Sequence, residues 1–205
     1  MRIERGPAEV IEAGVRGWLV SILLVLITLT FAVNGRSGQQ PDTPQSLLSR
    51  PSSDLGETRR QLLAFGDSAV GPVVDALNAD PNVGLMRGAV LIGVLETLNT
   101  ERARAALTKL LSDNRPRFRS QAAGALARIG DRCSVAHLIG LIGDTAVYAQ
   151  MASTDPFREE PLTVSSAAID ALERLTGVRQ SRTRSKTTRT YESWWQRNRS
   201  SLPCR

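Results

Sequence analysis

The feature that most constrains this chain is a sequence pattern that recurs four times. Four segments end alike: QLLAFGD at 61–67, GVLETLNT at 93–100, GALARIGD at 124–131 and DALERLTG at 170–177. Aligning them places leucine in one column at 62, 95, 126 and 172, and apolar residues in a second at 65, 98, 129 and 175. Successive members are 33, 31 and 46 residues apart. Self-similarity at such a period is typical of repeat proteins, whose units pack only against their neighbours.

The segments that follow three of these endings also align. Their apolar residues lie three positions apart at Val74 and Leu77, Leu107 and Leu110, and Leu138 and Leu141. Residues at this spacing share one face of a helix, so each unit is predicted to be two helices joined by a tight turn. The predicted fold is all-α, an α-solenoid with helices near 57–65, 68–78, 83–98, 101–112, 117–129, 132–142, 164–175 and 190–200. An irregular bundle is the alternative, but it would not keep the columns in phase.

The residues between successive helices agree with this division. Gly66 and Gly130 stand where the end of a helix needs a left-handed residue, and Asp67 and Asp131 follow near the start of the next helix. In the second unit, Asn99 occupies the glycine position, and asparagine can also adopt this conformation. The turns are therefore predicted to be equivalent.

Two stretches carry a resemblance to a known family. Arg119–Asp131 (RSQAAGALARIGD), with the helix at 135–142 that follows it, and Met86–Leu98 (MRGAVLIGVLETL) resemble short HEAT-type repeats, especially the variety found in phycobilisome-lyase proteins. The resemblance covers about residues 57–177 and implies a scaffold that binds other proteins. Tyr191–Asn198 (YESWWQRN) resembles a tryptophan-rich segment that often follows such repeats in bacterial envelope proteins.

The N-terminal part of the chain predicts a membrane segment. Residues 17–33 (GWLVSILLVLITLTFAV) contain no charge and would form a helix of about 25 Å, at the short end of a bilayer span. We expect an uncleaved signal anchor after the flank 1–16, with a cleaved signal peptide as the alternative. The basic residues on either side favour export of the C-terminal part. Residues 34–56, rich in Ser, Pro and Gln, are predicted to be a flexible linker.

The remaining boundaries follow from the repeat and from charge. Residues 57–177 form the predicted repeat domain, with an insertion at 144–163 that lengthens the last unit. The formal net charge of +6 comes from the basic tail at 178–205, which holds eight basic residues and one acidic residue. Such a tail can bind an anionic surface, acidic lipid or nucleic acid. We expect the domain to be exported, which makes nucleic acid the least favoured of the three. A capping helix containing tryptophan is expected within the tail.

Several residues are candidates for contact with a protein partner. In HEAT-like solenoids the second helix of each pair lines the inner surface, where Glu96 and Asp170 are expected beside the arginines. Long insertions often carry function, and aromatic residues there and in the tail could anchor a partner. The predicted partner-binding residues are Arg87, Arg119, Arg128, Arg174, Tyr148, Phe157 and Trp194.

The composition argues against catalysis and against metal binding. Cys133, Cys204 and His137 are too few to form a zinc cage or a disulfide framework. Cys133 and His137 lie one turn apart on a predicted helix, but no nearby carboxylate would orient the histidine. We therefore predict no catalytic, cofactor-binding or metal-binding residues and no cofactor.

Together these observations predict a non-catalytic protein-interaction scaffold, held at the bacterial cell envelope by an N-terminal membrane anchor. Its protein partner is not identified by the sequence. The alternative is an adaptor that faces the cytoplasm and whose basic tail binds nucleic acid or anionic lipid. A third, disfavoured function is that of an enzyme resembling a chromophore lyase.

Overall fold

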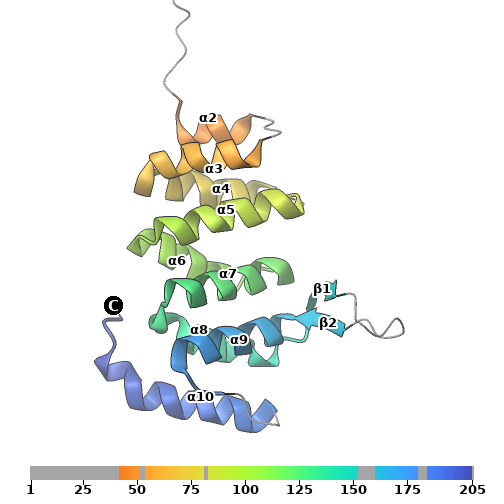
Figure 1. The fold of residues 1–205 in the computed structure, drawn as a ribbon, viewed down its shortest axis with the longest axis vertical. Helices are drawn as coiled ribbons and strands as arrows, with labels where there is room; N and C mark the ends of the chain where they lie inside the picture. The colour runs from red at the N-terminus through yellow and green to blue at the C-terminus, as the bar shows by residue number, and fades with distance from the viewer. Residues whose placement is uncertain (1–41, 51–53, 81–82, 152–159, 180–183, 205) are drawn as a thin grey trace, which may run out of the picture. The chain divides into compact units, whose positions relative to one another are not determined.

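The computed structural model describes residues 42–50, 54–80, 83–151, 160–179 and 184–204 (Figure 1). The chain divides into two compact units, Met1–Asp42 and Thr43–Arg205, and every described helix and strand belongs to the second. The predicted flank at 1–16 and membrane segment at 17–33 lie outside the described residues. Within the described ranges, no helix is both long enough and apolar enough to span a bilayer.

The helices of the second unit stack in two layers (Figure 1). One layer consists of α3 (Leu55–Ala64), α5 (Leu85–Leu98), α7 (Pro116–Ile129) and α9 (Val164–Thr176). The other contains α4 (Val70–Ala79), α6 (Glu101–Leu110) and α8 (Val135–Gly140). Contacts join α3 to α5, α5 to α7 and α7 to α9 along the first layer, and α4 to α5, α6 to α7 and α8 to α9 across the layers. This arrangement supports the predicted helical solenoid.

The turns between helices are equivalent along the stack, as predicted. Gly66, Asn99, Gly130 and Gly177 all have positive φ, at 57°, 49°, 80° and 72°. In two of these turns the chain continues as a short 3₁₀ segment, η1 (Gly66–Ala69) and η2 (Arg132–Ser134), before the next helix begins. Thr100 caps α6 by accepting a hydrogen bond from the backbone N–H of Ala103. A residue in the left-handed conformation ends a helix and turns the chain toward the next one. Glycine adopts this conformation without steric strain because it has no Cβ.

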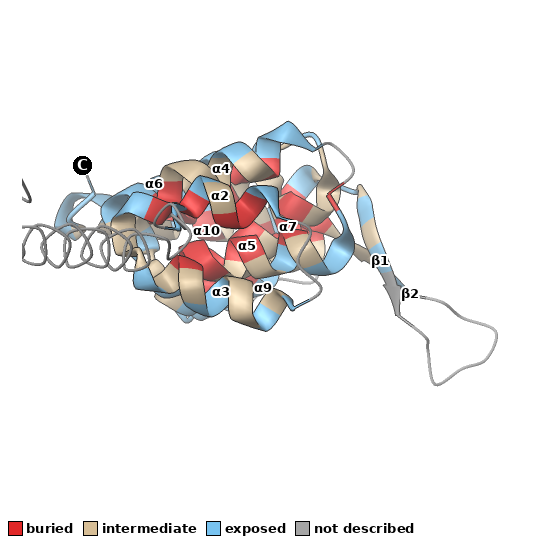
Figure 2. Ribbon diagram, turned by 90° about the horizontal axis from the view of Figure 1, so that it is seen from above, coloured by how far each residue is buried: buried red, intermediate tan, exposed pale blue. Residues whose placement is uncertain are grey.

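The core lies between the two layers, where Figure 2 shows the buried residues gathered. The leucine column of the repeat is fully buried at Leu62, Leu95, Leu126 and Leu172. Small residues let neighbouring helices approach closely, and α7 contributes several buried alanines. Gly88 of α5 lies against the ring of Phe118 in α7, so that a Cβ added there would be 2.9 Å from a ring carbon.

The N-terminal end of the stack is covered by a helix that the sequence reading did not expect. Residues predicted as linker form α2 (Pro44–Ser49), which packs on α3 and α4 and buries Leu47 and Leu48. Thr43 caps this helix in a capping box with Ser46. A helix of six residues is too short to show a periodic pattern of apolar residues. The Thr43-Pro44 pair, typical of a helix start, was the sequence signal for α2.

The C-terminal end is covered by α10 (Arg184–Asn198), which contacts α8 and the 3₁₀ segment η3 (Leu141–Gly143) (Figure 1). Tyr191 is fully buried, and its hydroxyl donates a hydrogen bond to the carbonyl oxygen of Val178 at 3.0 Å. The basic tail, in which a helix was predicted near 190–200, is helical from Arg184 onward. The capping helix was predicted, but it begins earlier and uses tyrosine as its deepest residue.

The insertion forms a two-stranded antiparallel hairpin that projects from the stack (Figures 1 and 2). Strand β1 (Val147–Met151) pairs with β2 (Glu160–Thr163), in a register that matches Val147 with Thr163. The register shifts between Val147 and Ala149, which leaves Tyr148 at an irregularity in the ladder. The sequence analysis predicted an insertion at 144–163 but assigned it no secondary structure.

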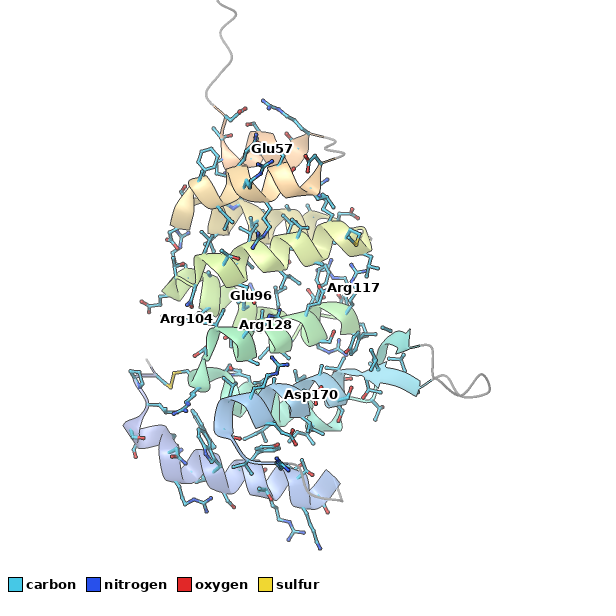
Figure 3. The ribbon with its side chains drawn as sticks, in the orientation of Figure 1. Glu57, Glu96, Arg104, Arg117, Arg128 and Asp170 are labelled. Carbon is cyan, nitrogen blue, oxygen red and sulfur yellow. A yellow bond between two sulfur atoms is a disulfide. The ribbon has the colours of Figure 1, made fainter. Side chains whose placement is uncertain are left out.

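A disulfide joins Cys133 in η2 to Cys204, which lies 71 positions later in the sequence, with the two Cα atoms 5.4 Å apart (Figure 3). The sequence analysis concluded that two cysteines are too few for a disulfide framework and did not consider this single bond. One bridge is enough to attach the C-terminal end of the chain to η2. The pairing depends on the return of α10 and the following residues toward α8, a tertiary relationship that spacing alone does not reveal.

Candidate functional site

The exposed surface of the α3, α5, α7 and α9 layer is the candidate partner-binding surface. We call its part on α5, α7 and α9 the outer face, in the sense that it is turned away from the core; these helices carry the residues predicted above to line the inner surface of the solenoid. On α7, the residues turned away from the core recur at helical spacing: Arg117, Gln121, Gly124 and Arg128. On α5 and α9, the outer face contains Ala89, Gly93, Glu96, Thr97, Asp170, Glu173 and Arg174. Figure 3 labels residues of this face on three successive helices.

The centre of the outer face is occupied by an ion pair between neighbouring repeats. Arg128 donates from Nε and Nη2 to the two carboxylate oxygens of Glu96, at 2.6 and 2.8 Å (Figure 3). The guanidinium also covers Gly124, whose added Cβ would be 3.1 Å from Nη1. The hydrogen bond to Glu96 raises the pKa of Arg128. Two predicted partner residues are thus already paired with one another.

Arg87 holds the end of the stack together in this structure. Its Nη2 donates a hydrogen bond to the carbonyl oxygen of Leu48 in α2. The side chain also lines a small pocket between α2, α3 and α5, together with Leu47, Arg50, Leu55, Thr58, Val90 and Leu91. A partner could use Arg87 only by displacing this internal contact.

Arg119 likewise serves an internal contact rather than a free surface. Its Nε donates to Oδ2 of Asp144 at 2.7 Å, and its Nη1 donates to the carbonyl oxygens of Asp113 and Asn114 at 2.7 and 3.2 Å. The side chains of Arg119 and Asp144 are 14% and 19% exposed. Burial is the largest influence and raises the pKa of Asp144, but the hydrogen bonds from Arg119 and from the backbone N–H of Ala146, together with the charge of Arg119, outweigh it, so that the pKa is lowered overall.

Two further accessible residues of the outer face are on α9. Asp170 and Arg174 are both exposed, one turn apart. Burial by its neighbours raises the pKa of Asp170, the charge of Glu173 adds to this, and Arg174 opposes it. This end of the face therefore combines an accessible acid and an accessible base.

The insertion and the tail contribute their predicted residues unequally. Tyr148 is half-buried, and its pKa is raised first by burial and then by the negative charge of Asp170. Phe157 lies outside the described residues. Trp194 is half-buried and packs against the core beside Trp195, so the aromatic pair belongs to the cap.

Two polar atoms on α7 were missed by sequence reasoning. Nε of Arg117 and Oε1 of Gln121 are buried and have no hydrogen-bond partner within the described part of the chain. Buried polar atoms nearly always have a partner in folded proteins. The two residues are four positions apart, so an unpaired donor and an unpaired acceptor lie one helical turn from each other on the outer face. Their spacing was visible in the sequence, but their burial was not.

The only histidine in the sequence and its neighbouring cysteine do not form a nucleophilic pair. Cys133 is bonded to Cys204, and the His137 side chain is exposed on α8. In the described residues, no group of three or more His, Cys, Asp or Glu side chains is arranged to hold a metal ion.

Comparison with known proteins agrees with this architecture. A family model described as HEAT repeats matches residues 70–155, which run from α4 through β1. The match supports a HEAT-type repeat protein. No curated protein and no solved structure matches the chain. HEAT repeats generally mediate protein–protein interaction and are typically non-catalytic. The finer resemblance to phycobilisome-lyase repeats stays a prediction.

Proposed function

We propose that this chain is a non-catalytic scaffold that binds another protein along its outer face, at the cell envelope of a bacterium. The observation that carries the binding role is the pair of unpartnered polar atoms at Arg117 and Gln121, within a face that repeats over three helices. A peptide backbone offers both a carbonyl to accept from a guanidinium N–H and an N–H to donate to an amide oxygen. Because both atoms are buried, a partner segment lying across α7 would pair with them once the Arg117 and Gln121 side chains turn outward.

The disulfide supports the envelope location. Such bonds form and persist in oxidising compartments and are rare in the reducing cytosol. The bond between Cys133 and Cys204 therefore favours an exported second unit, in keeping with the apolar run at 17–33 as an anchor. The same bond counts against the alternative of an adaptor that faces the cytoplasm and binds nucleic acid.

The binding role is tested by exchanging charges on the outer face without changing the net charge. The double variant Asp170→Lys/Arg174→Glu alters two exposed residues of α9. The matched control Asp75→Lys/Lys109→Glu makes the same exchange at exposed positions on α4 and α6, in the other layer. Cross-linking in cells, followed by mass spectrometry, is expected to recover a partner with the wild type and the control and to lose it with the first variant. Equal recovery from both variants would remove the outer face as the binding surface.

The location is tested separately in spheroplasts. A protease added from outside is expected to digest a C-terminal tag, and the size of the remaining chain shows whether the N-terminal segment has been cleaved. A protected tag would place the second unit in the cytoplasm and restore the alternative.

A further inference from the structure

The last helix of the stack, α10, has two faces of opposite character. Its inward face carries Thr187, Tyr191, Trp194 and Asn198, spaced by four, three and four residues. Thr187 and Tyr191 are buried, and Trp194 packs on the core. Asn198 donates from Nδ2 to the carbonyl oxygen of Trp194 at 2.7 Å. Residues at this spacing share one face of a helix, and through this face α10 packs on the stack.

The outward face of α10 carries positive charge at the same periodicity. Lys186, Arg189, Ser193 and Arg197 follow one another by three, four and four residues, and all four are exposed. We call Lys186, Arg189 and Arg197 the basic face. The exposed Arg179 and Arg199 lie just before and just after the helix, and Glu192 is the exposed acid of α10 among the described residues. At 1.5 Å per residue, the three charges extend over about 16 Å.

These charges are held in place rather than carried on a flexible strip. Tyr191 hydrogen-bonds to Val178 on one side of the helix, and the disulfide from Cys204 to Cys133 fixes the chain that follows it. Because the helix is ordered before any ligand arrives, binding does not have to order it. The basic face is therefore a preformed array of fixed spacing.

We propose that the basic face of α10 binds the anionic headgroups of a phospholipid bilayer. A helix lying on its side with lysine and arginine outward presents the geometry of peripheral binding to an acidic membrane surface. Trp194 lies beside this face while half-buried, and tryptophan favours the boundary between headgroups and acyl chains. A nucleic acid is the poorer fit, because no aromatic residue lies on the basic face itself to stack a base. The inference does not depend on partner binding by the outer face.

The second unit, residues 43–205, is suited to test this inference. It is compact, and every residue of the described hydrophobic core lies in it. It also lacks the predicted membrane segment, which would bind vesicles by itself. Of the three tryptophans in the sequence, only Trp194 and Trp195 remain in this unit, so its fluorescence reports on α10 alone. Cooperative unfolding in urea and an intact disulfide establish that the unit is folded before binding is measured.

The experiment measures co-sedimentation and tryptophan fluorescence with vesicles of phosphatidylcholine alone or mixed with phosphatidylglycerol. We expect binding to the anionic vesicles only, weakened by salt, with a blue shift of the fluorescence. The variant Lys186→Gln/Arg189→Gln/Arg197→Gln is expected to bind roughly 100-fold more weakly, because each basic residue near an acidic surface contributes about 1 kcal/mol. The control Arg60→Gln/Lys109→Gln/Arg132→Gln removes the same charge from exposed positions on α3, α6 and η2 and should retain binding.

Three outcomes would overturn the inference. Absence of binding to anionic vesicles by the folded wild-type unit would remove the lipid ligand. Equal loss in both triple variants would show an effect of net charge alone rather than of this face. Tighter binding to a single-stranded oligonucleotide than to the vesicles, lost in the α10 variant, would assign the face to nucleic acid instead. None of these results depends on the cross-linking experiment on α9.

Discussion

Arg119 donates from Nε to Oδ2 of Asp144 at 2.7 Å, which joins the first turn of α7 to the first residue of the insertion. The same guanidinium also donates hydrogen bonds to the backbone carbonyl oxygens of Asp113 and Asn114. One side chain therefore holds the loop before α7 and the loop after η3 together. Its place in the structure makes it a support of the fold.

Replacing Arg119 by methionine is expected to lower the free energy of unfolding by about 2–3 kcal/mol. The substitution leaves a half-buried carboxylate and carbonyl oxygens without a donor, which costs more than an exposed ion pair gains. The matched control is Arg128→Met, which breaks the pair with Glu96, where the arginine side chain is 53% exposed. We expect that loss to be below about 1 kcal/mol. Urea unfolding of both variants makes the comparison, and equal losses would contradict it.

The two glycines of α5 predict opposite effects of the same substitution. Gly88→Ala places a Cβ 2.9 Å from the buried ring of Phe118, and we expect a loss of about 1–3 kcal/mol in unfolding free energy. Gly93 has no atom within 4 Å of an added Cβ, so Gly93→Ala should stabilise the helix by up to about 1 kcal/mol. Thermal unfolding of the two variants measures the difference. A stable Gly88→Ala variant would show that α5 and α7 can separate without cost.

Loss of the disulfide is expected to weaken the C-terminal end of the stack. A bridge that closes a loop of this length stabilises a protein by about 2–4 kcal/mol. Cys204→Ser should lower the urea midpoint by a corresponding amount, and a reducing agent should lower the wild-type midpoint while leaving the variant unchanged. Tryptophan fluorescence follows α10 in the same titration of the unit 43–205. A wild type insensitive to reduction would contradict the structural role of the bond.

Tyr191 predicts a loss of stability at alkaline pH. Burial is the main cause that raises its pKa, to about 12, with smaller contributions from the charges of Glu173 and Asp170. An unfolded tyrosine ionises near pH 10, so the stabilisation is complete below about pH 10 and is lost as the pH rises toward about 12.

The absorbance of tyrosinate measures the ionisation of Tyr191, and urea unfolding measures the free energy of unfolding, both as the pH is raised from about 10 to about 12. Tyr148→Phe leaves Tyr191 as the only tyrosine in the chain, and it should then titrate late, with unfolding. Tyr191→Phe should remove most of the alkaline slope, at the loss of the hydrogen bond to Val178. Ionisation of Tyr191 near pH 10 in the folded protein would contradict its burial.

The repeat itself could be predicted from sequence because its signals are local. The leucine column at 62, 95, 126 and 172 is buried as expected, and the residues at 66, 99, 130 and 177 share a left-handed backbone. Each signal needs only a few neighbouring residues, since helix periodicity and helix ends are decided within one or two turns. The predicted helices therefore match the observed ones within a few residues, apart from α10.

The contacts between distant segments could not be predicted in the same way. Arginines look alike in a sequence, but Arg87 donates to α2, Arg119 to the insertion and Arg128 to α5. Which of them face a partner depends on how the helices are stacked. Likewise, the bond between Cys133 and Cys204 depends on where α10 returns against the stack. These three arginines were predicted to face a partner, but each makes a hydrogen bond within the chain. Their nearest acceptors lie on neighbouring helices or loops of the stack.

The two ends of the stack also bear on self-association. A row of repeats normally exposes an apolar layer at each end, to which another copy could add. Here α2 covers one end with Leu47 and Leu48 turned inward, and α10 covers the other with its charged side outward. Positive charge repeated on every copy repels a second α10 from the first. The described stack is thus closed at both ends by helices of the same chain, which disfavours the end-to-end addition of another copy.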